Sequence, residues 1–74
     1  MTTSTYTQSY PVNGMTCGHC VASVTEEIEE LAAVREVQVD LVEGGTSIVT
    51  ITSDQPLDED AVRDAVAEAG YQLA

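Results

Sequence analysis

The sequence predicts an α+β protein with the ferredoxin-like element order βαββαβ, in which a four-stranded antiparallel sheet carries two helices on one face. Two observations lead to this fold. Strand-like alternation and helical apolar stripes follow one another in that order, separated by short turn sequences. The length of 74 residues allows a single domain with a small core. We therefore expect a flexible terminus at residues 1–5 and one domain over residues 6–74.

The first strand is predicted from Tyr6 to Asn13, where Tyr10 and Val12 lie on one face of an alternating pattern. Pro11 has no N–H to donate to a neighbouring strand. We therefore expect Pro11 to face an unpaired position or to lie near the end of the strand.

The first helix is predicted from Cys17 to Ala32, after a turn that Gly14 allows, with Thr16 as its N-cap. Its apolar residues recur at helical spacing and form one stripe: Val21, Val24, Ile28 and Leu31. Its acidic residues largely occupy the other faces: Glu26, Glu27, Glu29 and Glu30. Because these carboxylates lie about two turns from the cysteines, we interpret them as a solvated face and not as metal ligands.

A β-hairpin follows, with Gly44 and Gly45 in its turn. Both strands alternate, so one side of each is expected to face the core. The inward positions are Val37, Val39 and Leu41 on the first strand and Ser47, Val49 and Ile51 on the second. Ile48 is expected to point outward.

The second helix is predicted after Asp58, a favourable N-cap, with Glu59 and Asp60 where a helix N-terminus attracts negative charge. Gly70 ends it as the residue after the C-cap. The predicted buried stripe consists of Leu57, Val62, Ala65, Val66 and Ala69. Residues Tyr71–Leu73 are predicted to form a short last strand.

The charge of the chain excludes several classes of partner. Thirteen acidic residues against two arginines give a formal net charge of −11, which we interpret as a solvated acidic surface. Repulsion opposes nucleic acid and stable association with anionic membranes. No basic start with an apolar run is present, and no stretch approaches the ~20 apolar residues of a membrane span. We expect a cytoplasmic location, where thiols stay reduced.

Both cysteines and the only histidine lie in one segment, residues 14–20, between the first strand and the first helix. Positions three apart share a helix face, so the thiols of Cys17 and Cys20 can point into one small volume. The positive end of the helix favours thiolate over thiol. Two soft thiolates select Cu(I) or another soft ion, whereas a structural zinc site would need two further cysteine or histidine ligands that the chain lacks.

Three other interpretations fit a pair of cysteines. Cysteines that only pack in a core do not explain the neighbouring Gly14, Thr16 and Gly18. A structural disulfide would close a very small loop and stabilise little. A redox Cys-x-x-Cys pair is the strongest competitor. Against it, a threonine precedes Cys17 where thioredoxin-like proteins have tryptophan, and the chain is too short for their fold.

The motif Gly-Met-Thr-Cys-Gly-His-Cys of residues 14–20, followed by a helix, a hairpin, a second helix and Gly70-Tyr71, resembles the heavy-metal-associated (HMA) domain. The resemblance extends from about Tyr6 over the rest of the chain, and within the family it is strongest to bacterial copper chaperones of the CopZ type. It implies a carrier, not an enzyme. Such a carrier binds Cu(I) in the cytoplasm and passes it by thiolate exchange to the metal-binding domain of a copper-transporting P-type ATPase.

The same resemblance implies roles for individual residues. Cys17 and Cys20 are the metal ligands, and Met15 is the apolar anchor beneath the loop. Tyr71 matches a tyrosine that shields the site. His19 matches a residue that tunes thiol acidity or adds a third ligand when two molecules share copper, and an exposed loop histidine without an essential role is the alternative.

Two-coordinate Cu(I) leaves one side of the ion open, which predicts copper-bridged homodimers when no acceptor is present. Some chaperones of this family dock through lysines, and this chain has only Arg35 and Arg63 as cations. An acceptor would therefore need compensating positive charge, or apolar contacts around Met15 and Thr16. The motif leaves open a metal-binding domain of a P-type ATPase or of a mercury reductase, and less readily a thiol-disulfide oxidoreductase.

Overall fold

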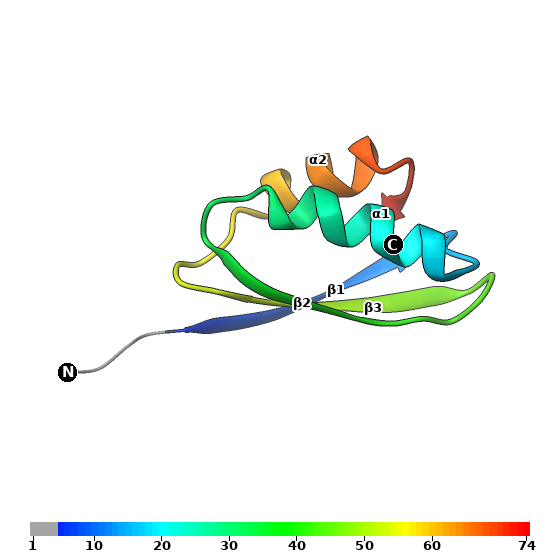
Figure 1. The fold of residues 1–74 in the computed structure, drawn as a ribbon, viewed down its shortest axis with the longest axis horizontal. Helices are drawn as coiled ribbons and strands as arrows, with labels where there is room; N and C mark the ends of the chain where they lie inside the picture. The colour runs from blue at the N-terminus through cyan, green and yellow to red at the C-terminus, as the bar shows by residue number, and fades with distance from the viewer. Residues whose placement is uncertain (1–4) are drawn as a thin grey trace.

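The computed structural model describes residues 5–74 and contains the predicted elements in the predicted order. They are β1 (Tyr6–Asn13), α1 (Gly18–Glu29), β2 (Val34–Asp40), β3 (Thr46–Ser53), α2 (Glu59–Glu68) and β4 (Gln72–Leu73). The strands form one antiparallel sheet in the order β2-β3-β1-β4, and both helices cover the same face of it (Figure 1). The ferredoxin-like prediction is confirmed. Of the flexible terminus predicted at residues 1–5, all but Thr5 lies outside the described residues.

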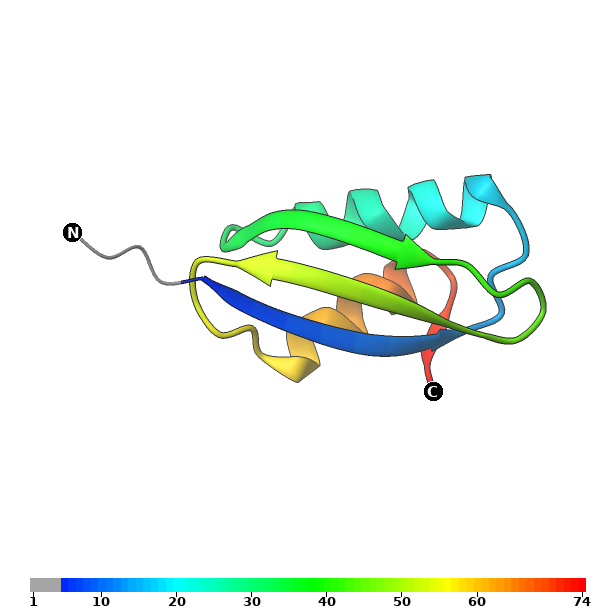
Figure 2. The ribbon, with the colours of Figure 1, turned by 90° about the horizontal axis from the view of Figure 1, so that it is seen from below.

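The central strand β1 explains how the sheet tolerates a proline. β1 pairs with β3 over its whole length, whereas on its other side it pairs only with the short β4 (Figure 2). Ala74 donates its N–H to the Pro11 carbonyl at 2.9 Å, so the main-chain groups of Pro11 face the β4 side. The nitrogen of Pro11, which has no hydrogen to donate, therefore lies beyond the end of β4, as the sequence predicts.

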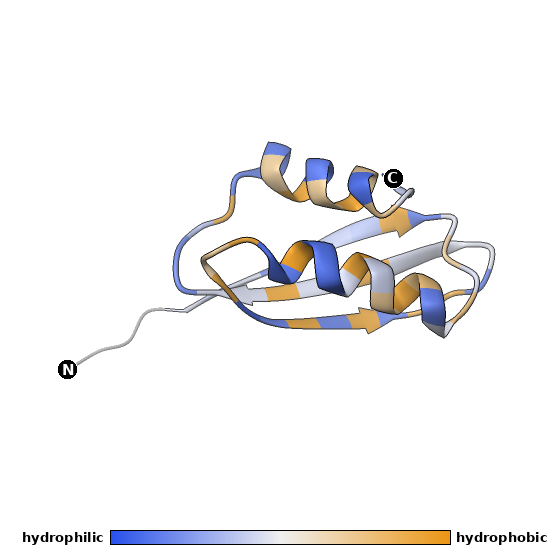
Figure 3. Ribbon diagram, turned by 45° about the horizontal axis from the view of Figure 1, so that its top comes forward, coloured by the Kyte–Doolittle hydropathy of each residue, from blue (hydrophilic) through white to orange (hydrophobic). Residues whose placement is uncertain are grey.

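The core lies between the sheet and the helices, where inward positions of β1 and β3 meet one apolar stripe from each helix (Figure 3). Its buried apolar residues are Tyr10, Val12, Met15, Val24, Ile28, Val49, Ile51, Val62, Ala65 and Val66. Buried Ser47 and Ser53 are both hydrogen-bonded, to the main chain of Val42 and of Gln55 respectively. Ile48 points outward and is 39% exposed, as predicted.

The start of α1 differs from its prediction. Thr16 is not the N-cap: that position belongs to Cys17, which is extended with φ −158° and ψ 176°, and no side chain caps the helix there. The Thr16 hydroxyl lies instead 3.7 Å from the Cys20 sulfur. A side chain engaged with that sulfur is not used to cap the helix.

The end of α1 also differs, because the helix stops at Glu29 instead of reaching Ala32. The N–H of Leu31 donates to the Ile28 carbonyl, and the N–H of Val34 donates to the Leu31 carbonyl, both at 3.0 Å. These tight turns reverse the chain into β2, which accordingly begins earlier than the alternating pattern indicates.

The second helix follows its prediction closely. Asp58 accepts the N–H of Asp60 at 3.0 Å and is the N-cap. Gly70 follows the C-cap with φ +93°, the left-handed conformation that ends many helices. The last strand is shorter than predicted, because Tyr71 belongs to the turn that leaves α2.

Neither helix resembles a membrane span. α1 has 12 residues and α2 has 10, and each keeps a hydrophilic face turned away from the sheet (Figure 3). Over residues 5–74, no helix combines the length and apolar content needed to cross a membrane.

Candidate metal centre

Residues 14–17, which we call the cysteine loop, connect β1 to α1 and are held from two directions. Gly14 has φ +91°, a conformation that residues with a side chain rarely adopt. The turn sends Met15 into the core, where its side chain is fully buried beneath the loop. The Met15 carbonyl accepts the N–H of Gly44, in the β2–β3 turn, at 3.2 Å. Side-chain packing and a hairpin contact therefore both fix the loop.

The two cysteine side chains converge at the end of this loop. Their sulfur atoms are 3.6 Å apart, and both residues are free thiols. Cys17 is exposed as the N-cap, while Cys20 is half-buried in the first turn of α1. The N–H groups of Cys20 and Val21 both donate to the Cys17 carbonyl, at 3.1 and 3.2 Å, which closes that first turn. The arrangement presents two sulfur atoms together, with Cys17 as the more accessible one.

The start of α1 favours negative charge on sulfur. The first turn contains no acidic residue and no side-chain cap, so its unpaired N–H groups and positive helix end are left for the thiols. Hydrogen bonds from the Thr16 N–H, the Tyr71 hydroxyl and the Thr16 hydroxyl lower the pKa of Cys20 to about 6, although partial desolvation opposes the shift. Thiolate is the form of cysteine that binds metals and attacks electrophiles.

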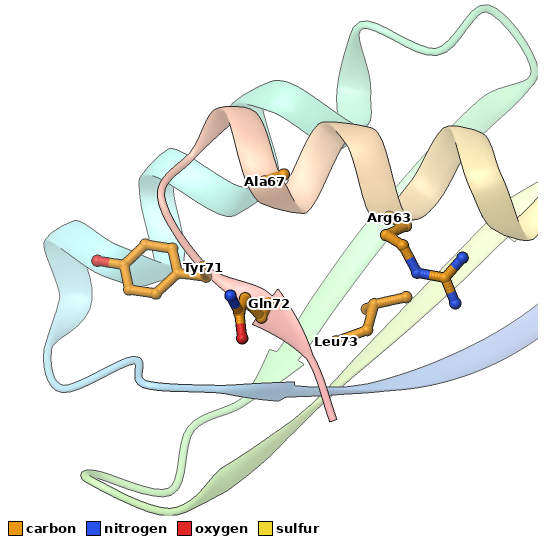
Figure 4. Close-up of a pocket in the computed structure, with 5 residues that line it drawn as sticks. All are labelled: Arg63, Ala67, Tyr71, Gln72 and Leu73. Atoms are coloured by element: carbon orange, nitrogen blue, oxygen red, sulfur yellow. The ribbon is translucent and has the colours of Figure 1, made fainter.

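Tyr71 reaches the cysteines from the far end of the chain. After Gly70, the N–H of Tyr71 donates to the Val66 carbonyl at 3.1 Å, in a Schellman motif that closes α2. The Tyr71 side chain then extends toward the segment that precedes α1 (Figure 4), where a Cβ added to Gly14 would meet its ring at 3.6 Å. Its hydrogen bond to Cys20, then burial and thiolate charge, raise the pKa of Tyr71, so the hydroxyl keeps its proton.

A surface depression of about 310 Å³ lies beside α2 and β4 and shares Tyr71 with the site (Figure 4). Its lining residues are Arg63, Ala67, Tyr71, Gln72 and Leu73. Neither cysteine lines it, so the sulfur pair is presented by the cysteine loop and not by this depression.

The other candidate ligands do not join the cysteines. His19 is exposed in the first turn of α1. Across residues 5–74, no three side chains of histidine, cysteine, aspartate or glutamate are grouped so that they could hold a metal ion. Within one molecule the site therefore offers two sulfur ligands, and a role of His19 in copper shared by two molecules stays a prediction.

Both arginines are already paired with carboxylates. Arg35 lies 2.6 Å from Asp54, and Arg63 lies 2.8 Å from Glu59 and 3.1 Å from Asp60. These pairs are largely exposed and each contributes little to stability. Over residues 5–74, each arginine therefore has at least one carboxylate beside it.

Two contacts of the site were not predicted from the sequence. Threonine before a helix is an ordinary N-cap signal, which predicts that Thr16 caps the helix and gives no sign of its contact with the sulfur. The spacing of four residues between Thr16 and Cys20 is the signal that could have revealed their contact. The bond from Gly44 to Met15 joins segments distant in sequence and has no local signal.

Comparison with known proteins shows the family of the chain. The family model described as "Heavy-metal-associated domain" matches residues 9–72. A COP-associated protein of Helicobacter felis is 36% identical over 63 residues, which are 85% of this chain and 91% of that protein. The copper chaperone CopZ of Bacillus subtilis is 38% identical over 63 residues, covering 85% and 88%. The solved N-terminal domain of ZntA in the apo-form superposes with a TM-score of 0.74 at 31% identity, covering 96% of this chain and 92% of that one. The chain belongs to the heavy-metal-associated domain family.

Proposed function

We propose that this protein is a cytoplasmic copper chaperone that binds Cu(I) through Cys17 and Cys20. The observation that carries the proposal is the pair of sulfur atoms 3.6 Å apart at the start of α1, one of them exposed. Soft thiolate ligands favour Cu(I), and no third side chain among residues 5–74 completes a zinc site. The identity of 38% to a copper chaperone supports the same metal. The chain acts as a carrier and not as an enzyme.

Transfer would proceed by exchange of thiolates, without release of the ion to water. Two sulfur ligands leave one side of Cu(I) open, so a partner's thiolate can form a new copper–sulfur bond there before one original bond breaks. The copper stays Cu(I) throughout. The partner's thiol gives its proton to water when its sulfur binds copper, and the cysteine that leaves copper takes a proton from water. Exposed Cys17 is the first sulfur that a partner can approach, whereas Cys20 is fixed in α1.

The acceptor we propose is the metal-binding domain of a copper-transporting P-type ATPase. Because both arginines are paired and the chain carries a net charge of −11, the acceptor should present positive or apolar groups around its own cysteines. Without an acceptor, the open side of copper can take a thiolate of a second copy, which gives a copper-bridged homodimer. Sedimentation with and without Cu(I) would detect that dimer.

A competition titration tests the metal. The fully reduced protein is titrated with Cu(I) against a chromophoric chelator, and with Zn(II) in parallel. We expect the protein to withdraw copper from the chelator and to bind zinc weakly. The variant C17S/C20S should lose copper binding, while S23A, at an exposed position of α1, should retain it. C17S should slow transfer to an acceptor.

Two outcomes would redirect the assignment. Normal copper transfer by C17S/C20S would refute the role of the cysteine pair. Weak copper binding together with a readily cycled Cys17–Cys20 disulfide would favour a thiol-disulfide oxidoreductase. The likeness to the N-terminal domain of ZntA supports a second candidate, the same metal-binding role within a longer protein such as a P-type ATPase.

A further inference from the structure

The β2–β3 turn lies directly beside the cysteine loop, although the two are distant in sequence (Figures 1 and 2). The N–H of Gly44 donates to the Met15 carbonyl at 3.2 Å. Among the described residues, this is the backbone hydrogen bond that ties residues 14–16 to another part of the chain. The hairpin therefore holds one particular peptide group, the one between Met15 and Thr16.

The opposite edge of that peptide group faces the metal centre. A trans peptide is planar, and its C=O and N–H point in opposite directions. With the Met15 carbonyl directed at Gly44, the Thr16 N–H of the same plane points away from the hairpin, and it makes a hydrogen bond to the Cys20 sulfur. The Thr16 hydroxyl lies 3.7 Å from the Cys20 sulfur, so both donors of Thr16 are on that side. Hydrogen bonds on the two edges of one peptide polarise and strengthen each other.

The Gly44 backbone is specialised for this contact. Its φ of +71° lies in the left-handed region, where residues with a side chain are strained and asparagine is the best tolerated. A Cβ added at Gly44 would meet nothing within 4 Å. The position is therefore restricted by its backbone conformation, not by space, and substitutions there test the orientation of its N–H.

We propose that Gly44 is a positioning residue of the metal centre, which orients the Met15–Thr16 peptide so that Thr16 donates to the Cys20 sulfur. The inference rests on the proposed function, in which Cys20 is a metal ligand. The hairpin thus acts on the chemistry of a sulfur that it does not touch.

The test compares G44V with G44N in the reduced, metal-free protein. Valine is strongly disfavoured at positive φ, whereas asparagine retains the turn. The Thr16 amide should exchange its hydrogen with solvent about tenfold faster in G44V than in the wild type, as expected for loss of a hydrogen bond to a charged group. The Thr16 amide proton should move upfield in the NMR spectrum. G44N should match the wild type in both.

Stability and metal binding are controlled separately. D58A, which removes the cap of the other helix, should lower the urea midpoint as G44V does but leave the chemical shift and the exchange rate of the Thr16 amide unchanged. An unchanged Thr16 amide in a folded G44V, or the same change in D58A, would overturn the proposal. Because both readouts use apo-protein, failure here is distinct from failure of the wild type to bind Cu(I), which would refute the proposed function instead.

Discussion

The two helices of this protein begin in opposite ways. α2 begins with a carboxylate cap, because Asp58 accepts the N–H of Asp60, and Glu59 and Asp60 add negative charge to its first turn. α1 begins at Cys17, without a side-chain cap and without an acidic residue in its first turn. The difference is notable in a chain with thirteen acidic residues, three of them farther along α1.

The contrast separates stability from function. Asp58 satisfies orphan donors of α2 and complements its dipole, which stabilises the helix. At α1 the same donors and the same positive end are left for sulfur, and Thr16 donates to Cys20 instead of capping. A helix that keeps the N–H groups of its first turn free for a ligand must be stabilised by other contacts. The buried side chain of Met15 supplies such contacts by packing in the core.

The largest expected effect follows from removing the buried side chain of Met15. M15A deletes a fully buried side chain beneath the cysteine loop and should lower the free energy of unfolding by about 2–5 kcal/mol. Urea denaturation measures the change. M15L, which nearly conserves volume, should cost less than about 1.5 kcal/mol. A loss in M15A no greater than that of M15L would show that α1 does not depend on packing from below.

The second prediction concerns the protonation of Cys20 and tests whether the start of α1 favours negative charge on sulfur. With its pKa lowered from 9.0 to about 6, Cys20 should be mostly thiolate at pH 7, where an ordinary thiol is only a few per cent ionised. At pH 7 the thiolate fraction of Cys20 should therefore exceed that of an ordinary thiol by more than about tenfold. Alkylation of Cys20 should show a midpoint near pH 6. A midpoint above pH 8 would contradict this account of the α1 start.

The same shift links stability to pH. The folded-state pKa of Cys20 lies below the unfolded value, so the thiolate favours the folded state. This contribution is complete above about pH 9 and is lost as the pH falls through about 6. C20S should remove that dependence, which urea midpoints at pH 6 and pH 9 would measure. The pKa of Glu27 is raised, mainly by the negative charge of Glu30.

Removing the carboxylate cap should have a smaller effect. D58A leaves the Asp60 N–H without its acceptor and should lower the free energy of unfolding by about 1 kcal/mol. Urea denaturation measures this loss, and D58N, which can still accept, should recover most of it. Copper binding and the Cys20 midpoint should not change, because α1 and α2 begin at opposite ends of the sheet (Figure 1). A changed midpoint would show that the two helix starts are coupled.

Most of the fold could be predicted because its signals are local. Alternation placed the strands, the helical stripe placed α1 and α2, and Asp58 and Gly70 marked the ends of α2 by their capping chemistry. The convergence of the two sulfur atoms followed from the spacing of Cys17 and Cys20.

The remaining features depend on competition and on distant contacts. Thr16 has the properties of an N-cap, but the nearby sulfur of Cys20 engages its hydroxyl, and local propensity cannot rank the two. The end of α1 is set by the turn into β2 and not by helix propensity. The contact between Gly44 and Met15 exists only once the sheet has formed. The sequence could therefore indicate the ligands but not the groups that orient them.

The smallest expected effect comes from making α1 begin as α2 does. G18E/H19D places carboxylates at the first two helical positions, matching Glu59 and Asp60, and a Cβ at Gly18 meets nothing within 4 Å. Each added charge should stabilise the helix by about 0.3–1 kcal/mol. The same charges disfavour thiolate, so the Cys20 midpoint should rise while the urea midpoint also rises. The neutral variant G18Q/H19N separates charge from the loss of glycine and should leave the Cys20 midpoint near that of the wild type.

If G18E/H19D gained no stability over this control, the absence of acid at the α1 start could not be attributed to the demands of the sulfur atoms. If it gained stability with an unchanged Cys20 midpoint, the free helix end would be irrelevant to the thiols.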